Sequence, residues 1–153
     1  MNSNLKIVFN CITQKHFKFQ GRASRKELWL FVICFELLIL ILKGIFFILS
    51  ILASSDYILK DTSFLLKLSI NSLFLIFFTI PLITVFVRRF HDLNFSGWWY
   101  LFFTTLISLG FSTVGKNVDK LFYVSIAFLI LFIILMCKKG TPTTNKYGEP
   151  PTY

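Results

Sequence analysis

Four long apolar stretches, separated by short polar segments, divide the sequence. They cover about residues 27–52, 64–87, 97–112 and 119–137. An α-helix needs about 20 mainly apolar residues to cross the hydrocarbon core of a bilayer, and short connections make successive helices antiparallel neighbours. The pattern therefore predicts an all-α integral membrane protein. Its fold would be a four-transmembrane-helix bundle in a single membrane domain over residues 1–153.

A short amphipathic helix is predicted in the cytoplasmic or interfacial segment 1–23, ahead of the first span. Leu5, Val8, Phe9 and Ile12 follow the i, i+3, i+4, i+7 spacing of one helical face. Such a helix can lie in the membrane interface or pack on the protein's own loops, and the sequence leaves both arrangements open.

The boundaries of three segments follow from local signals. Ser24-Arg-Lys-Glu27 fits the S-x-x-E capping box, in which the serine hydroxyl accepts from the glutamate amide, so the first span should begin here. Ser96 is a candidate cap for the third span. Residues 138–153 lack apolar periodicity and contain most of the prolines, which predicts an irregular tail.

Composition and charge favour a membrane environment. The chain is 56% hydrophobic, with 20 phenylalanines and a net charge of +9. The basic residues lie in short stretches between apolar runs, so anionic lipid headgroups are more plausible partners than nucleic acid. Three scattered cysteines and two histidines predict neither a metal site nor a cofactor.

The distribution of lysine and arginine predicts the orientation. Eleven lie in the amino-terminal segment, the middle connection and the tail, whereas four lie in the other two loops and their flanks. Positive charge is retained on the cytoplasmic side, so both termini should be cytoplasmic. The eleven are Lys6, Lys15, Lys18, Arg22, Arg25, Lys26, Arg88, Arg89, Lys138, Lys139 and Lys146.

Three polar motifs should meet on the cytoplasmic side, because four short helices keep their ends within a small area. The first motif is Gln20–Glu27, the second is Arg88–Trp99, and the third is Gly140–Gly148.

These motifs also carry a family resemblance. The patterns F-x-G-R-x-S-R-K-E-x-W, R-R-x-H-D-x-N-x-S-G-W-W and G-T-P-x-x-N-K-Y-G occur in this order. The chain resembles the bacterial inner-membrane family called domain of unknown function 805. The resemblance implies a small, multi-pass protein of the bacterial inner (plasma) membrane, and it supplies no activity, substrate or cofactor. Thr144 departs from the pattern, since many members have glycine there.

The second motif and its neighbours form a candidate binding site for a phosphate-bearing ligand, most simply an anionic phospholipid. Arginine is a planar, bidentate phosphate donor, and tryptophan can flank a headgroup or stack on arginine. The alternative is that the arginines enforce topology and cap helix carboxyl ends, with Asp92 as an internal ion-pair partner. The candidate residues are Arg22, Arg25, Arg88, Arg89, His91, Asp92, Trp98 and Trp99.

His91 and Asp92 do not make a convincing catalytic pair. Adjacent side chains usually point apart, and no serine or cysteine nucleophile is marked by its surroundings. We therefore predict no catalytic residues and a structural role for His91, which should bond a neighbouring segment. A membrane enzyme that acts on a phosphorylated lipid remains the third functional hypothesis.

Glu36 and Lys43 are charged residues well inside the first predicted span. An intramembrane carboxylate is costly, should face the bundle interior, and often marks an ion or proton path. The leading functional hypothesis is a non-enzymatic membrane component that engages anionic phospholipid or a protein partner, including a second copy of itself. The alternative is a small transporter or channel subunit that uses Glu36.

Overall fold

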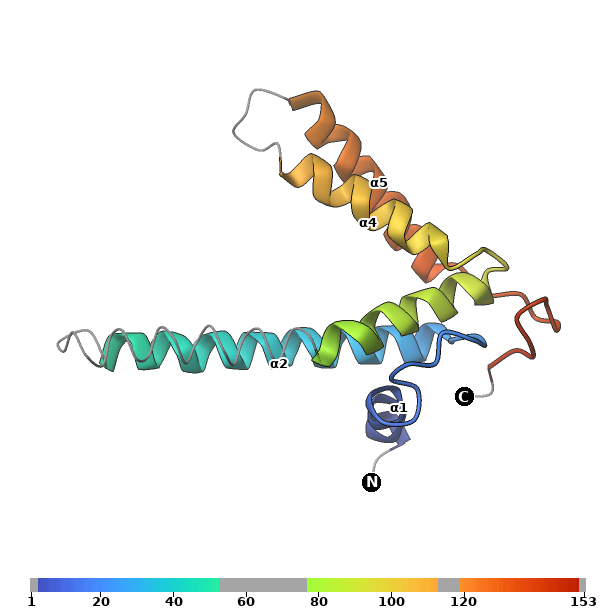
Figure 1. Cartoon of the computed structure of the whole chain (residues 1–153), viewed down its shortest axis with the longest axis horizontal. Coiled ribbons are helices and arrows are strands. Elements are labelled where there is room, and N and C mark those ends of the chain that lie inside the picture. Colours follow the sequence, from blue (N-terminus) through green and yellow to red (C-terminus); the bar gives the residue numbers. More distant parts are fainter. Residues whose placement is uncertain (1–2, 53–76, 113–118, 152–153) are drawn as a thin grey trace. The chain divides into compact units, whose positions relative to one another are not determined.

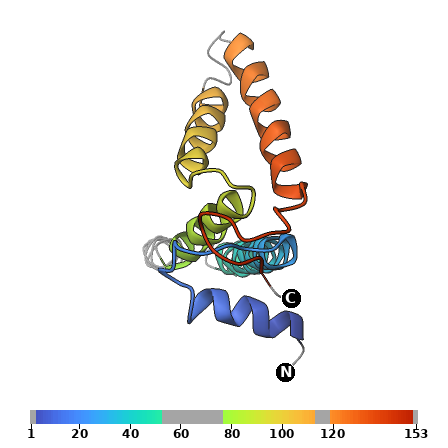
Figure 2. The same cartoon turned by 90° about the vertical axis from the view of Figure 1, so that its right-hand side faces the viewer.

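The computed structural model describes residues 3–52, 77–112 and 119–151, and its regular elements there are helices (Figures 1 and 2). The labelled helices are α1 (Ser3–Ile12), α2 (Arg25–Leu52), α4 (Trp98–Phe111) and α5 (Asp119–Cys137). Residues 77–92 form a further helix, drawn in green in Figure 1. Within the described ranges there is no strand, only one isolated bridge between Asn145 and Gly148. The all-helical prediction is confirmed.

The helix boundaries follow the apolar pattern closely, with one exception. α5 has the predicted limits, α4 is one residue shorter at each end, and α2 begins two residues early. The second predicted span was expected to end at residue 87, but the helix continues to residue 92. The helix continues past the apolar run because the charged groups of its last turn are engaged in ion pairs and buried, so polarity did not end it. The start of that predicted span and the loop after α4 lie outside the described residues.

Two of the described helices are long and apolar enough to cross a membrane. They cover Arg25–Ile51 and Lys120–Cys137, and the apolar helix Trp98–Phe111 is shorter. A helix rises about 1.5 Å per residue, so the first two match the thickness of a hydrocarbon core of about 30 Å. The four-span bundle as a whole stays a prediction.

The chain divides into two compact units. The first contains Met1–Phe17 and Trp29–Leu82, and the second contains Lys18–Leu28 and Ile83–Tyr153. In the first unit, α1 forms as predicted and buries Ile7 and Cys11.

α2 has one buried side within the first unit. Phe31, Phe35 and Phe46 are buried there. Phe35 also lies against Phe78, with their ring centroids 6.1 Å apart. The spacing of these phenylalanines along α2 is close to the helical repeat, so they mark one side of the helix.

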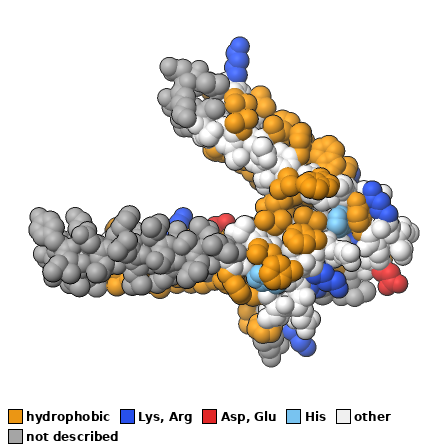
Figure 3. All heavy atoms as spheres, viewed as in Figure 1, with side chains coloured by type: hydrophobic (Ala, Val, Ile, Leu, Met, Phe, Trp, Pro, Cys, Tyr) orange, Lys and Arg blue, Asp and Glu red, His pale blue; other side chains and the backbone are white. Residues whose placement is uncertain are grey.

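The second unit is built on the α4–α5 hairpin, whose outer surface is largely hydrophobic (Figure 3). Phe103 lies between Phe90 and Phe132, with ring centroids 6.1 Å and 5.6 Å away. The two helices approach closely at Gly110, where an added Cβ would overlap the side chain of Ser125. Small residues at such a crossing let two helix backbones come together, as in other membrane helix pairs.

The turn before α4 depends on glycine rather than on the predicted serine cap. Gly97 is the N-cap and makes no side-chain capping bond, while the Ser96 carbonyl accepts from the Trp99 amide at 3.2 Å. An added Cβ on Gly97 would lie 2.6 Å from Val87 Cγ1. Asn94 has φ of 64°, a left-handed conformation that asparagine tolerates in turns. The close approach of the Gly97 backbone to the Val87 side chain therefore explains why glycine stands at this helix start.

Candidate functional site

All three polar motifs meet within the second unit, as predicted. The Ala23 amide donates to the Arg88 carbonyl at 3.0 Å, which ties the first motif to the second. The Thr141 amide donates to the Asp92 carbonyl at 3.0 Å, which ties the second motif to the third. Gly140 lies so close to Asp92 that an added Cβ would overlap its carboxylate. The second motif is thus the centre of this assembly.

Arg22 is the main link between the motifs. Its Nε donates to Asp92 Oδ1 at 2.9 Å, and its Nη1 donates to the carbonyl oxygens of Thr143 at 2.8 Å and Gly148 at 3.3 Å. Its Nη2 donates to the Thr141 carbonyl. The side chain is almost completely buried. A planar guanidinium has five donors spread over three nitrogens, so it reaches acceptors in several directions, whereas an ammonium group has three donors on one atom.

Arg89 shares the Asp92 carboxylate and caps α5. Its Nη1 pairs with Asp92 Oδ2, and its Nε and Nη2 donate to the Met136 carbonyl at 3.2 Å and 3.1 Å. Nη2 also donates to the Lys138 carbonyl. The last carbonyls of a helix lack intrahelical donors and carry partial negative charge, so the guanidinium satisfies both needs. Burial lowers the pKa of Arg89, which still stays charged. Arg89 therefore has both features of the structural alternative, a helix carboxyl end as acceptor and Asp92 as ion-pair partner, whereas Arg22 pairs with Asp92 and binds tail carbonyls but caps no helix.

A second buried ion pair joins Arg88 to Glu27. Arg88 Nη1 lies 2.7 Å from Glu27 Oε1, and both side chains are at most 2% exposed. The Glu27 amide donates to Ser24 Oγ at 3.0 Å, so the predicted serine cap of α2 is confirmed. Within the described part of the chain, Arg88 Nε and Nη2 are buried and have no hydrogen-bond partner. We call Arg22, Glu27, Arg88, Arg89 and Asp92 the arginine cluster.

His91 bonds a neighbouring segment, as predicted. Its Nδ1 lies 3.2 Å from the Gly21 carbonyl, and its ring stacks on Tyr147 with centroids 3.8 Å apart. Burial lowers the pKa of His91, and the positive charges of Lys146 and Arg88 lower it further, while the Gly21 bond opposes them. His91 is therefore neutral near pH 7. A carbonyl can only accept, so Nδ1 carries the proton and Nε2 does not.

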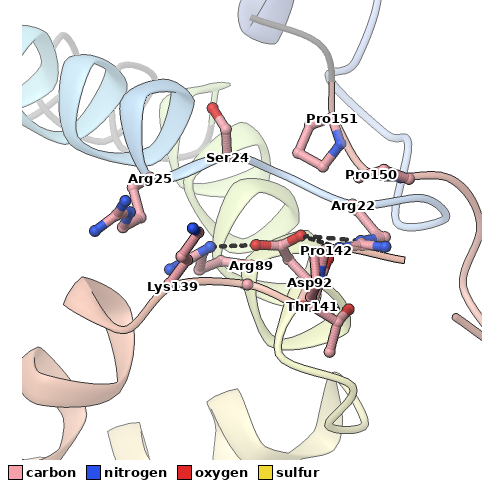
Figure 4. Close-up of a pocket in the computed structure, with 11 residues that line it drawn as sticks. Arg22, Ser24, Arg25, Arg89, Asp92, Lys139, Thr141, Pro142, Pro150 and Pro151 are labelled. Carbon is pink, nitrogen blue, oxygen red and sulfur yellow. Dashed lines mark hydrogen bonds and ion pairs between the residues drawn. The ribbon is translucent and has the colours of Figure 1, made fainter. Parts of the chain in front are cut away.

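A cavity of about 200 Å³ opens beside the arginine cluster (Figure 4). We call it the tail pocket, because the carboxy-terminal segment forms one of its walls. Figure 4 shows Asp92 between Arg22 and Arg89, joined to both by ion pairs. The lining residues are Arg22, Ser24, Arg25, Arg89, Asp92, Lys139, Gly140, Thr141, Pro142, Pro150 and Pro151.

Arg25 and Lys139 are the exposed cations of the tail pocket. Arg25 is the first residue of α2, and Lys139 comes two residues after α5 ends. Arg25 Nη1 approaches the Cys137 carbonyl at 3.4 Å, so the beginning of one membrane-span candidate meets the end of the other. The pocket therefore lies at the ends of both candidates.

The predicted binding residues separate into two groups. Four of them line the tail pocket, namely Arg22, Arg25, Arg89 and Asp92, whereas Arg88, His91, Trp98 and Trp99 do not. Trp98 is 77% exposed at the start of α4, and Trp99 packs edge-on against Phe95. Sequence reasoning missed Ser24, Lys139 and the tail wall as pocket residues. The Lys138-Lys139 pair directly after the fourth predicted span is the sequence signal that indicates Lys139.

That Glu36 faces the interior of a four-span bundle stays a prediction, and the structure describes its surroundings only within the first unit. Glu36 and Lys43 are exposed on α2, because Phe31 and Phe35 take its buried side. Among the described residues neither charged group has an ion-pair partner. In the same ranges, no group of three or more His, Cys, Asp or Glu residues is arranged to hold a metal ion.

Comparison with known proteins identifies the family. The family profile described as "Protein of unknown function (DUF805)" matches residues 16–149. The chain belongs to this family. It is 25% identical over 142 residues to the inner membrane protein YhaI of Escherichia coli K12, covering 93% of the chain and 92% of the relative. It is 26% identical over 141 residues to the inner membrane protein YhaH of the same strain, covering 92% of each. No solved structure matches this member of the DUF805 family.

Proposed function

We propose that this DUF805 protein is a multi-pass component of the bacterial inner membrane with both termini in the cytoplasm. The names of the relatives YhaI and YhaH support the membrane, and the excess of basic residues near the termini supports the orientation. In this arrangement the tail pocket lies at the level of the cytoplasmic headgroups, because it sits where α2 begins and α5 ends.

The amino-terminal helix fits this placement as an interfacial helix. Leu5 and Phe9 are more than half exposed on one side of α1, while Ile7 and Cys11 are buried on another. Lys6 is exposed beside them. A helix with apolar and basic groups facing outward binds an anionic membrane surface through both.

We further propose that the protein is not an enzyme and holds the phosphate of an anionic phospholipid in the tail pocket. The observation that supports this function is the lining itself, in which four cationic side chains face one carboxylate at the ends of two membrane-span candidates. Guanidinium and ammonium groups bind phosphate through charge-assisted hydrogen bonds. Juxtamembrane basic groups also gain about 1 kcal/mol each near an anionic leaflet.

The buried arginine cluster and the exposed cations of the tail pocket have different roles. The arginine cluster holds the three motifs together, so replacing Arg88 or Arg89 would disturb the fold as well as any ligand. Arg25 and Lys139 are exposed and face the cavity, so they would provide the ligand contacts that can be removed without unpairing a buried charge.

The test is native mass spectrometry of protein purified in detergent, using an Arg25→Gln/Lys139→Gln variant. The matched control is Lys26→Gln/Lys138→Gln. These lysines adjoin the test positions, are exposed, and do not line the pocket, so the net charge changes equally. We expect a stoichiometric anionic phospholipid on the wild type and the control, and its loss from the test variant. Equal lipid on all three proteins, or none on the wild type, would refute the proposal.

A further inference from the structure

The charges around the tail pocket do not balance. In the arginine cluster, three guanidinium groups are paired with only two carboxylates, and all five groups are buried. In the pocket lining, four cations face one carboxylate, which leaves a formal charge of +3. Arg22 and Arg89 share the Asp92 carboxylate, whereas Arg25 and Lys139 are exposed and have no ion-pair partner among the described residues. The second unit therefore presents a site for a ligand with more than one negative charge.

We infer that the tail pocket selects a phosphate monoester, which is close to a dianion, over a phosphate diester, which has one negative charge. This inference rests on the proposed function, because it concerns the ligand of the same pocket. A monoester carries a charge of about −1.5 to −2 at pH 7, since its second pKa is about 6. It also has three oxygens without a substituent, against two in a diester.

The donors and the walls of the pocket agree with this choice. Arg25 and Lys139 offer charged donors from the beginning of α2 and from the segment just after α5. Three of the lining residues are prolines, which have no backbone N–H and form an uncharged wall on the tail side.

The monoester has two possible sources. One is a membrane lipid whose headgroup is a bare phosphate, such as phosphatidic acid, and the other is a soluble phosphate in the cytoplasm. The position of the pocket at the ends of two membrane-span candidates favours the lipid. The chemistry that recognises the phosphate is the same for both sources, so the experiment must separate them.

The experiment measures lipid binding to the full chain in phosphatidylcholine nanodiscs. One set of nanodiscs contains phosphatidic acid, and a second set contains phosphatidylglycerol at the same mole fraction. We expect phosphatidic acid to bind about tenfold more tightly at pH 7.5, from one additional unit charge beside two exposed cations. The preference should shrink at pH 5.5, below the second phosphate pKa. Arg25→Gln/Lys139→Gln should abolish the preference, and Lys26→Gln/Lys138→Gln should retain it.

The outcomes separate this inference from the proposed function. Equal binding of the two lipids, lost in the Arg25→Gln/Lys139→Gln variant, would overturn the inference and leave the proposed function standing. No binding of either lipid would overturn both. If millimolar inorganic phosphate displaces phosphatidic acid from the wild type, the pocket selects the monoester and also accepts its soluble form. If the Arg25→Gln/Lys139→Gln variant still prefers phosphatidic acid, the preference arises at another surface and the inference is overturned.

Discussion

Replacing Arg22 by lysine separates a structural role from a topological one. Lysine keeps the positive charge that the positive-inside rule counts, so the orientation of the chain in the membrane should not change. The geometry does change, because a single ammonium group replaces a planar donor that binds Asp92 and three tail carbonyls. We therefore expect Arg22→Lys to insert normally but to hold the carboxy-terminal segment poorly.

The magnitude follows from the acceptors that lose their donor. A lysine at position 22 has its three donors on one atom, so we expect it to keep the Asp92 pair and one carbonyl but not to reach all three carbonyls that Nη1 and Nη2 of arginine bind from two positions. Two carbonyls then lose a charge-assisted bond, and each loss costs about 1 kcal/mol because water can reach this partly exposed segment. The expected total loss of stability of the tail contacts is about 2 kcal/mol. This corresponds to a roughly 30-fold increase in the equilibrium constant for local opening of the tail.

The assay is hydrogen exchange of residues 140–151 in detergent, together with limited proteolysis. The matched control is Arg25→Lys, because Arg25 is exposed and its one described bond is the long contact to Cys137. We expect exchange protection of the tail to fall about 30-fold in Arg22→Lys and to stay unchanged in the control. Tail protection in Arg22→Lys within twofold of the wild type would show that the arginine does not hold the motifs together.

Two further predictions concern packing and pH. Gly110→Ala should lower the free energy of unfolding by about 1–3 kcal/mol because its Cβ would overlap Ser125, and Ser125→Gly should restore only part of the loss in the double variant, since the Leu121 carbonyl oxygen would still lie 2.8 Å from that Cβ. Thermal unfolding of the three proteins checks this, and an unchanged midpoint in Gly110→Ala would contradict it. Burial lowers the pKa of His91, so the unfolded state binds more protons than the folded state as the pH falls. The stability that neutral His91 contributes to the folded state is therefore fully present above its unfolded pKa of about 6.5. It is lost as the pH falls toward the lower pKa of His91 in the folded state. His91→Asn, which keeps a donor for the Gly21 carbonyl but does not titrate, should flatten the pH dependence of tail protection between pH 7 and pH 5, and an unchanged profile would exclude His91 as its source.

The order of apolar and polar residues was sufficient to predict most of the helices. α4 and α5 match the predicted limits within one residue, because in both the apolar run is also the helical run. The same reasoning did not predict that residues 88–92 are helical, with the charged side chains of Arg88, Arg89 and Asp92 buried. Polarity predicts exposure only when a charged group has no partner within the protein. Here the partners come from distant segments, which a local pattern cannot reveal.

At the candidate site, too, the sequence predicted one part of the arrangement and folding decided the other. Sequence motifs alone determined that the three polar segments belong together and that arginine would dominate their chemistry. Only the tertiary structure decided what each arginine does, since Arg22 and Arg89 are held by Asp92 and by carbonyls of the tail and α5, while Arg25 faces the cavity. The physical reason is that a guanidinium has the same charge and donors in every position. Its role depends on which acceptors folding brings within about 3 Å of it and on how much water remains beside it.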